Sequence, residues 1–153
     1  MEDKDNLQLV SFEVGNELFA APIKKIQEII RLTSIVKIPK APDFVEGVIN
    51  LRGRVIPVID LKKRFDMSAG FDESKARIVV AEIRGLCIGL IVDAVQEVLR
   101  PGADSFEETP SVVSGVNQQF IHGIVKQNDK MLIVLELDKL FSSSETEVLE
   151  QVR

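Results

Sequence analysis

The chain has 153 residues, which is enough for one domain of ordinary size or for two small intertwined lobes. Its 45% apolar and 28% charged residues exclude a disordered chain, and its net charge of −5 argues weakly against a general nucleic-acid binder. The single cysteine excludes an intramolecular disulfide. The acidic N-terminus shows no signal peptide, and no apolar run approaches the ~20 residues of a membrane span. We therefore expect a cytoplasmic protein.

Short runs rich in Ile and Val, separated by turn residues, predict about ten β-strands. Four pairs of runs are typical of hairpins, with turns at Gly15-Asn16, Arg52-Gly53, Arg84-Gly85 and Asn128-Asp129. Pro22 favours a single helical turn that starts at Ile23. Ser142 and Glu145 form a capping-box pattern, which predicts a short C-terminal helix. The segments 67–73 and 101–114 are expected to be linkers.

The sequence contains an internal repeat. Ser11–Arg31 aligns without gaps on Val80–Arg100, and Gly47–Phe65 aligns on Gly123–Phe141. The repeat predicts an all-β fold of two five-stranded barrels that arose by tandem duplication and share an apolar core, because closing each small sheet removes its bare edges. The expected lobes span roughly 8–66 and 77–141. The first hairpin is also able to complete the opposite lobe, and the sequence leaves this exchange of strands open.

Residues that carry enzyme chemistry are scarce. His122 is the only histidine, so no zinc cluster is possible, and Cys87 lies in a strand, where a thiol is usually an inert small hydrophobe. Asp60 follows an apolar run like a phosphoacceptor aspartate, but we expect it to cap the turn 61–65, as Asp138 is expected to cap the turn 139–141. No catalytic residue, metal site or cofactor is therefore predicted.

Charge is distributed unevenly along the chain. Residues 24–64 hold ten Lys or Arg and four Asp or Glu, whereas residues 70–153 are acidic overall. A basic first lobe is compatible with an acidic protein surface or with nucleic acid, and a merely solvated face explains it equally well.

The stretch Phe44–Leu61 (FVEGVINLRGRVIPVIDL) resembles the signature of CheW-type chemotaxis coupling proteins. The likeness continues in Pro22–Ile29 (PIKKIQEI), in Ile88–Val95 (IGLIVDAV), and from Gly123 to Leu140, so it covers nearly the whole chain. The resemblance implies a single CheW-like domain, 1–153, with two five-stranded SH3-like barrels around a common core. It also implies a non-catalytic adaptor that joins the cytoplasmic tips of methyl-accepting chemoreceptors to the regulatory domain of the histidine kinase CheA. Such an adaptor is cytoplasmic, is recruited to membrane receptor arrays, and involves no nucleic acid and no membrane insertion of its own.

The resemblance also implies two sets of contact residues. In the family, a groove between the lobes takes the receptor's helical hairpin, and here it would include Val10, Ile23, Ile26, Glu28, Arg52, Ile78 and Val95. For the four Ile23, Ile26, Ile78 and Val95, a role in the core is an equally good interpretation of their spacing. The kinase contact lies on the first lobe, which suggests the region 35–47, with Ile35, Ile38 and Gly47 as its candidates.

Arg52 is the candidate for which a contact role is argued most directly. The repeat places Asn128 at the equivalent position, so the fold itself does not require a guanidinium there, and we expect Arg52 to project outward from its turn. Glu28 has the counterpart Glu97, and its presence in both copies suggests a structural task such as holding a turn. A nucleic-acid-binding double barrel and an enzyme with a site between the lobes are the two alternative functions.

Overall fold

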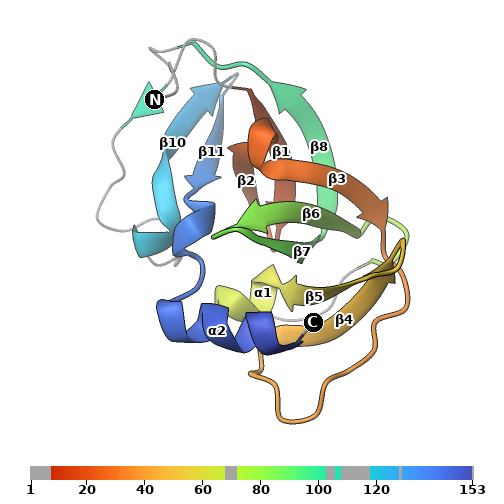
Figure 1. Cartoon of the computed structure of the whole chain (residues 1–153). Coiled ribbons are helices and arrows are strands. Elements are labelled where there is room, and N and C mark those ends of the chain that lie inside the picture. Colours follow the sequence, from red (N-terminus) through yellow and green to blue (C-terminus); the bar gives the residue numbers. More distant parts are fainter. Residues whose placement is uncertain (1–7, 68–71, 103–105, 108–117, 128, 153) are drawn as a thin grey trace.

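The computed structural model describes residues 8–67, 72–102, 106–107, 118–127 and 129–152 (Figure 1). In these residues the fold is mainly β, as expected, and the strands are β1 (Leu9–Val14), β2 (Glu17–Pro22), β3 (Ile26–Arg31), β4 (Val45–Leu51), β5 (Arg54–Asp60), β6 (Arg77–Ile83), β7 (Leu86–Val92), β8 (Ala94–Leu99), β9 (Phe106–Glu107), β10 (Ile121–Gln127) and β11 (Lys130–Leu135). The helices are α1 (Leu61–Arg64) and α2 (Ser143–Val152), with 3₁₀ turns at Ile23–Lys25, Gln118–Phe120 and Leu137–Lys139. Most of each expected linker lies outside the described residues.

Two of the hairpin turns have positive φ at both central residues. The φ values are +54° and +84° at Arg52 and Gly53, and +51° and +81° at Arg84 and Gly85. Positive φ at both positions gives the turn a twist that matches the right-handed twist of the flanking strands. The local sequence therefore sets the register of β4 with β5 and of β6 with β7.

The two copies of the repeat exchange their first hairpins. One sheet has the order β8-β1-β2-β11-β10-β9 and the other has the order β3-β6-β7-β5-β4. We call them the six-strand lobe and the five-strand lobe. The hairpin β1-β2 of the first copy lies in the six-strand lobe, and the equivalent hairpin β6-β7 of the second copy lies in the five-strand lobe. The exchange that the sequence left open is thus reciprocal, and 8–66 and 77–141 delimit the two copies rather than the two sheets.

Each sheet is closed by the chain segment that follows the third strand of a copy. In the five-strand lobe this segment is fixed at Val36, which exchanges two backbone hydrogen bonds with Val48 of β4, at N···O distances of 2.9 and 2.8 Å. In the six-strand lobe the short strand β9 pairs with β10, where Glu107 is opposite Ile124. Val48 and Ile124 are equivalent positions of the repeat, so the two lobes close in the same way and leave few free sheet edges.

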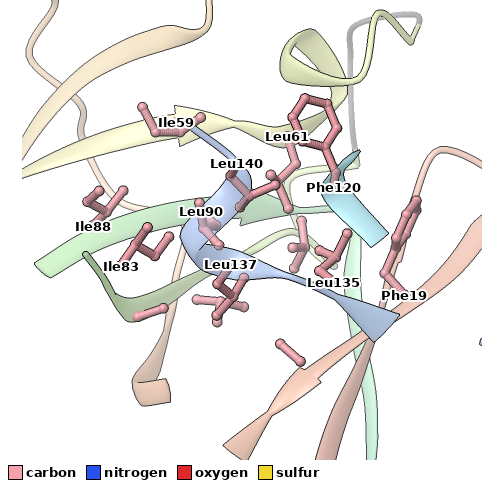
Figure 2. Packing of buried hydrophobic residues seen from close by; sticks show 14 of the residues in the cluster. Phe19, Ile59, Leu61, Ile83, Ile88, Leu90, Phe120, Leu135, Leu137 and Leu140 are labelled. Atoms are coloured by element: carbon pink, nitrogen blue, oxygen red, sulfur yellow. The ribbon is translucent and has the colours of Figure 1, made fainter. Parts of the chain in front are cut away.

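Three apolar clusters fill the molecule. Equivalent residues form the interiors of the two lobes; Leu9, Val125, Leu132 and Val134 in the six-strand lobe correspond to Ile78, Ile49, Ile56 and Val58 in the five-strand lobe. The third and largest cluster lies between the sheets and receives residues from both lobes, among them Phe19, Leu90, Leu135 and Leu140 (Figure 2). Many strand residues are therefore buried on both faces of their sheet. This central cluster is the shared apolar core that the repeat predicts.

The helical segments have the caps that the sequence predicts, with one exception. Asp60 Oδ1 accepts a hydrogen bond of 2.9 Å from the Lys62 amide at the start of α1. At α2, the Glu145 amide donates to Ser142 Oγ (3.1 Å) and the Ser142 amide donates to Glu145 Oε1 (2.8 Å), which is a complete capping box. The prediction for Asp138 is wrong: its carboxylate instead accepts from the Arg84 amide at 2.9 Å, in the turn between β6 and β7.

Candidate protein-interaction surfaces

Arg52 and Glu28 form a bidentate ion pair on the surface of the five-strand lobe. Arg52 Nη1 and Nη2 donate to Glu28 Oε2 and Oε1 at 2.6 and 2.9 Å. Arg52 belongs to the turn between β4 and β5, and Glu28 belongs to β3, so the pair joins two strands that lie at opposite edges of the sheet order. The hydrogen bonds from Arg52 hold the pKa of Glu28 below its ordinary value, and the carboxylate raises the pKa of Arg52.

This geometry refines the sequence expectation for both residues. Arg52 does project outward, because 73% of its side chain is exposed, but its carboxylate partner lies within the same chain. Glu28 binds the turn between β4 and β5 through its side chain, whereas its counterpart Glu97 has no such contact among the described residues, so the contact is not a task shared by both copies. The sequence selected both residues and did not predict that they bind each other.

The remaining residues of the expected receptor set differ in their accessibility. Ile23 is 37% exposed. Ile26 and Val95 are equivalent residues of the two copies and are half-buried against the central cluster from the two lobes. Val10 and Ile78 are buried. As their side chains lie in the interior, the structure does not support the direct contact expected for Val10 and Ile78; their position suits a role in packing.

The expected kinase set has a similar division. Ile35 and Ile38 are half-buried and Gly47 is buried. Gly47 has a φ of +149°, and a Cβ on it would come within 2.8 Å of the Val36 carbonyl carbon. Gly47 is thus required for the close approach of Val36 to β4, which is a structural reason for glycine that is independent of any partner.

Sequence reasoning missed two exposed apolar side chains in this region. Val36 is 65% exposed and Val55 is 44% exposed. Val36 pairs with Val48 of β4, and Val55 of β5 pairs with Asn50 of β4, so both lie on or beside the β4-β5 hairpin. The strand register decides which side chains face solvent, and it is known only once the sheet is known. The exposure of these two residues could therefore not be read from the sequence.

The basic character of residues 24–64 is partly neutralised within the chain. At least five of the ten cations form ion pairs, namely Lys25 with Asp138, Arg52 with Glu28, Lys62 with Asp93, Lys63 with Glu46, and Arg64 with Glu145. The Arg64 guanidinium also lies over the rings of Phe44, Phe120 and Phe141. A cation that is already paired releases few counterions from nucleic acid, so the structure gives the nucleic-acid alternative little support.

No arrangement for catalysis emerges from the described residues. His122 Nδ1 lies 2.9 Å from Glu136 Oε2 on the surface, and Cys87 is buried and donates to Gln27 Oε1 at 3.1 Å. Within the part of the chain that the structure describes, no group of three His, Cys, Asp or Glu is placed to hold a metal. No helix among these residues is long and apolar enough to cross a membrane.

A family model described as a CheW-like domain matches residues 8–145. The chain belongs to the CheW family. The chemotaxis protein CheW of Treponema pallidum is 36% identical over 149 residues, which cover 95% of this chain and 88% of that protein. The CheW of Thermotoga maritima is also 36% identical, over 87% of this chain and 86% of that one. The crystal structure of the scaffolding protein TtCheW from Thermoanaerobacter tengcongensis matches with a TM-score of 0.84 and 42% identity, covering 92% of this chain and 95% of that chain.

Family membership confirms the main expectations from the sequence. The resemblance to CheW is confirmed, and so is the β fold with its C-terminal helix. CheW proteins are non-catalytic scaffolding proteins of chemotaxis, so the expected adaptor class is confirmed and the enzyme alternative is dropped. The individual contact residues stay predictions, because a family match does not test them.

Proposed function

We propose that this CheW family member couples the cytoplasmic tips of chemoreceptors to the histidine kinase CheA through two different surfaces of the five-strand lobe. The observation that carries the proposal is that this lobe presents two exposed features of different chemistry. One is the Arg52–Glu28 ion pair at the β4-β5 turn, and the other is the apolar pair Val36 and Val55.

The receptor surface is centred on the Arg52–Glu28 pair and includes the exposed Ile23. Most of Arg52 faces solvent while two of its donors bind Glu28. A guanidinium has five donors, so Arg52 retains donors for carbonyls or a carboxylate of a helical hairpin. Ile26 of β3 and Val95 of β8 are half-buried against the central cluster, so they would contribute to receptor binding through packing.

The kinase surface is the apolar patch of Val36 and Val55, with Ile35, Ile38 and Gly47 beneath or beside it. Both residues pair with β4, Val36 with Val48 and Val55 with Asn50, and exposed aliphatic side chains of this kind are typical of protein interfaces. Val48, which pairs with Val36, precedes Arg52 by four residues of a strand, or roughly 13 Å. The two surfaces share no residue but adjoin at Val55, which lies three residues after Arg52, so the proposal is that two partners bind side by side. The protein acts in the cytoplasm and is recruited to receptor arrays by these contacts.

Two substitutions test the proposal when each is titrated with both partners. Arg52→Ala should weaken binding of the receptor tip by about tenfold or more, because the partner groups lose a charge-assisted contact, and should leave binding of the CheA regulatory domain unchanged. Val36→Asp should weaken binding of the regulatory domain by a similar factor and spare the receptor. Equal losses toward both partners in either variant would show that the residue acts on the fold, and the assignment would be wrong.

A further inference from the structure

The two lobes differ at the end where the interior cluster reaches the surface. In the five-strand lobe two contacts close this end. Arg52 binds Glu28, and Cys87 Sγ donates to Gln27 Oε1. In the six-strand lobe the repeat replaces Cys87 with Leu18 and Arg52 with Asn128, so neither contact can form. Gln96, the counterpart of Gln27, donates instead to Glu13 Oε2 at 3.3 Å.

A cavity of about 200 Å³ lies at this end of the six-strand lobe. We call it the Glu97 pocket; it is lined by Ser11, Leu18, Gln96, Glu97, Leu99, Lys130 and Leu132. Its apolar wall is formed by three leucines of the lobe's interior cluster. An apolar cavity of about 150 Å³ admits benzene, so this pocket is large enough for one long side chain.

The Glu97 carboxylate is available in this pocket. Ser11 Oγ binds only the Glu97 backbone, because it donates to the carbonyl oxygen (3.0 Å) and accepts from the amide (3.1 Å). Among the residues that the structure describes, no cation or donor is bound to the Glu97 side chain. By the repeat, Glu97 occupies the position of Glu28, but the residue in place of Arg52 is Asn128, which carries no guanidinium.

We propose that the Glu97 pocket binds an arginine side chain supplied by a protein partner. The guanidinium would pair with Glu97 in the fork geometry seen between Arg52 and Glu28, and its methylenes would pack on Leu99 and Leu132. Lys130 also lines the pocket, and its counterpart in the other lobe is Arg54. Arg54 lies near enough to the Arg52–Glu28 pair to lower the pKa of Glu28, so a second cation beside such a pair is compatible with its formation. The proposal rests on the repeat and the pocket and is independent of the receptor and kinase contacts.

The test uses two cyclic peptides that reproduce the chain's own turn, Asn50 to Val55, both with uncharged citrulline at the position of Arg54. One peptide has arginine at the position of Arg52, and the other has citrulline there as well. Each peptide is titrated into the full chain while backbone amide shifts are followed by NMR. We expect the arginine peptide to shift the amides of Leu18, Glu97 and Leu99. Both the citrulline peptide and the variant Glu97→Gln should bind at least about tenfold more weakly. Glu82→Gln, which removes an exposed carboxylate of β6, is the matched control and should bind like the unmodified chain.

A second variant shows whether the peptide is able to bind such a site at all. Arg52→Ala leaves Glu28 without its arginine, so this variant should gain peptide-dependent shifts around Glu28. Shifts around Glu28 in that variant with none around Glu97 in the unmodified chain would overturn the proposal. Equal affinity for the arginine and citrulline peptides, or shifts that survive in Glu97→Gln, would overturn it as well.

Discussion

Gly47 offers the sharpest test of how the five-strand lobe is closed. In Gly47→Ala, the new methyl group would collide with the Val36 carbonyl, and alanine would have to hold a φ of +149°. Such backbone strain costs of order 1–3 kcal/mol. Moving Val36 away would break its two hydrogen bonds to Val48, at about 1 kcal/mol each. We therefore expect the free energy of unfolding to fall by about 3–5 kcal/mol.

The repeat supplies matched controls within the same molecule. Gly123 is the counterpart of Gly47 but has no positive φ, and among the described residues a Cβ on it would meet only Glu107 O, at 3.8 Å. Gly123→Ala should change stability by less than about 0.5 kcal/mol. Gly53→Ala, at a φ of +84° and with no described residue within 4 Å of the new Cβ, should cost only about 1 kcal/mol of backbone strain. Urea denaturation of the three variants measures these differences, and similar losses for Gly47→Ala and Gly123→Ala would refute the close-approach argument.

Three further predictions concern charged groups. Arg52→Ala should raise the pKa of Glu28 toward 4.5, as measured by NMR titration, and should change stability little, because the pair is exposed; an unmoved pKa would contradict the ion pair. Burial alone would raise the pKa of Glu145, but the Ser142 amide and Arg64 hold it below 4.5. Its stabilising effect is therefore complete above pH 4.5 and is lost as the pH falls through the lowered value. The protection factors of the α2 amides, which correct for the intrinsic pH dependence of exchange, should fall on such acidification and be lower in Glu145→Gln than in the unmodified chain at pH 7; equal protection in that variant would contradict the prediction. Burial, followed by Glu46, raises the pKa of Asp60, so its ionised form costs stability once the pH exceeds the raised value. Asp60→Asn keeps a capping side chain, and its free energy of unfolding should rise relative to that of the unmodified chain as the pH goes from acid to neutral. Urea denaturation measures this, and a difference in unfolding free energy that stays constant with pH would contradict it.

Much of the fold could be predicted because the two copies of the repeat align residue by residue, so each expected strand in one copy has an expected counterpart in the other. The alignment of the two copies brings β4 onto β10 residue by residue. It also places the segments that close the two sheets, at Val36 and at Glu107, in corresponding parts of the two copies. The exchange of hairpins was beyond reach of the sequence. The hairpins β1-β2 and β6-β7 have strands of six and seven residues and similar apolar patterns, so each satisfies either sheet, and only the tertiary fold decides which third strand it joins.

The candidate site could be predicted only in part for a related physical reason. Alternating apolar and polar residues identify the buried face of a strand when only one of its faces lies in the core. In β1, five of six residues are buried because one face fills the lobe interior and the other meets the central cluster. Val10 and Ile78 therefore could not be distinguished from surface contacts by pattern alone. Arg52 stood out because a tight turn must point its side chain outward, and that reasoning needed no tertiary information.

The central claim is that receptor and kinase bind this protein at the same time through different surfaces. The most direct test is a calorimetric titration of a receptor-tip fragment into the chain alone and into the chain saturated with the CheA regulatory domain. The account predicts dissociation constants that agree within a few-fold, because the Arg52–Glu28 pair and the patch of Val36 and Val55 do not share residues. Loss of receptor binding in the saturated sample would show that the two partners compete for one surface, and it would contradict the account.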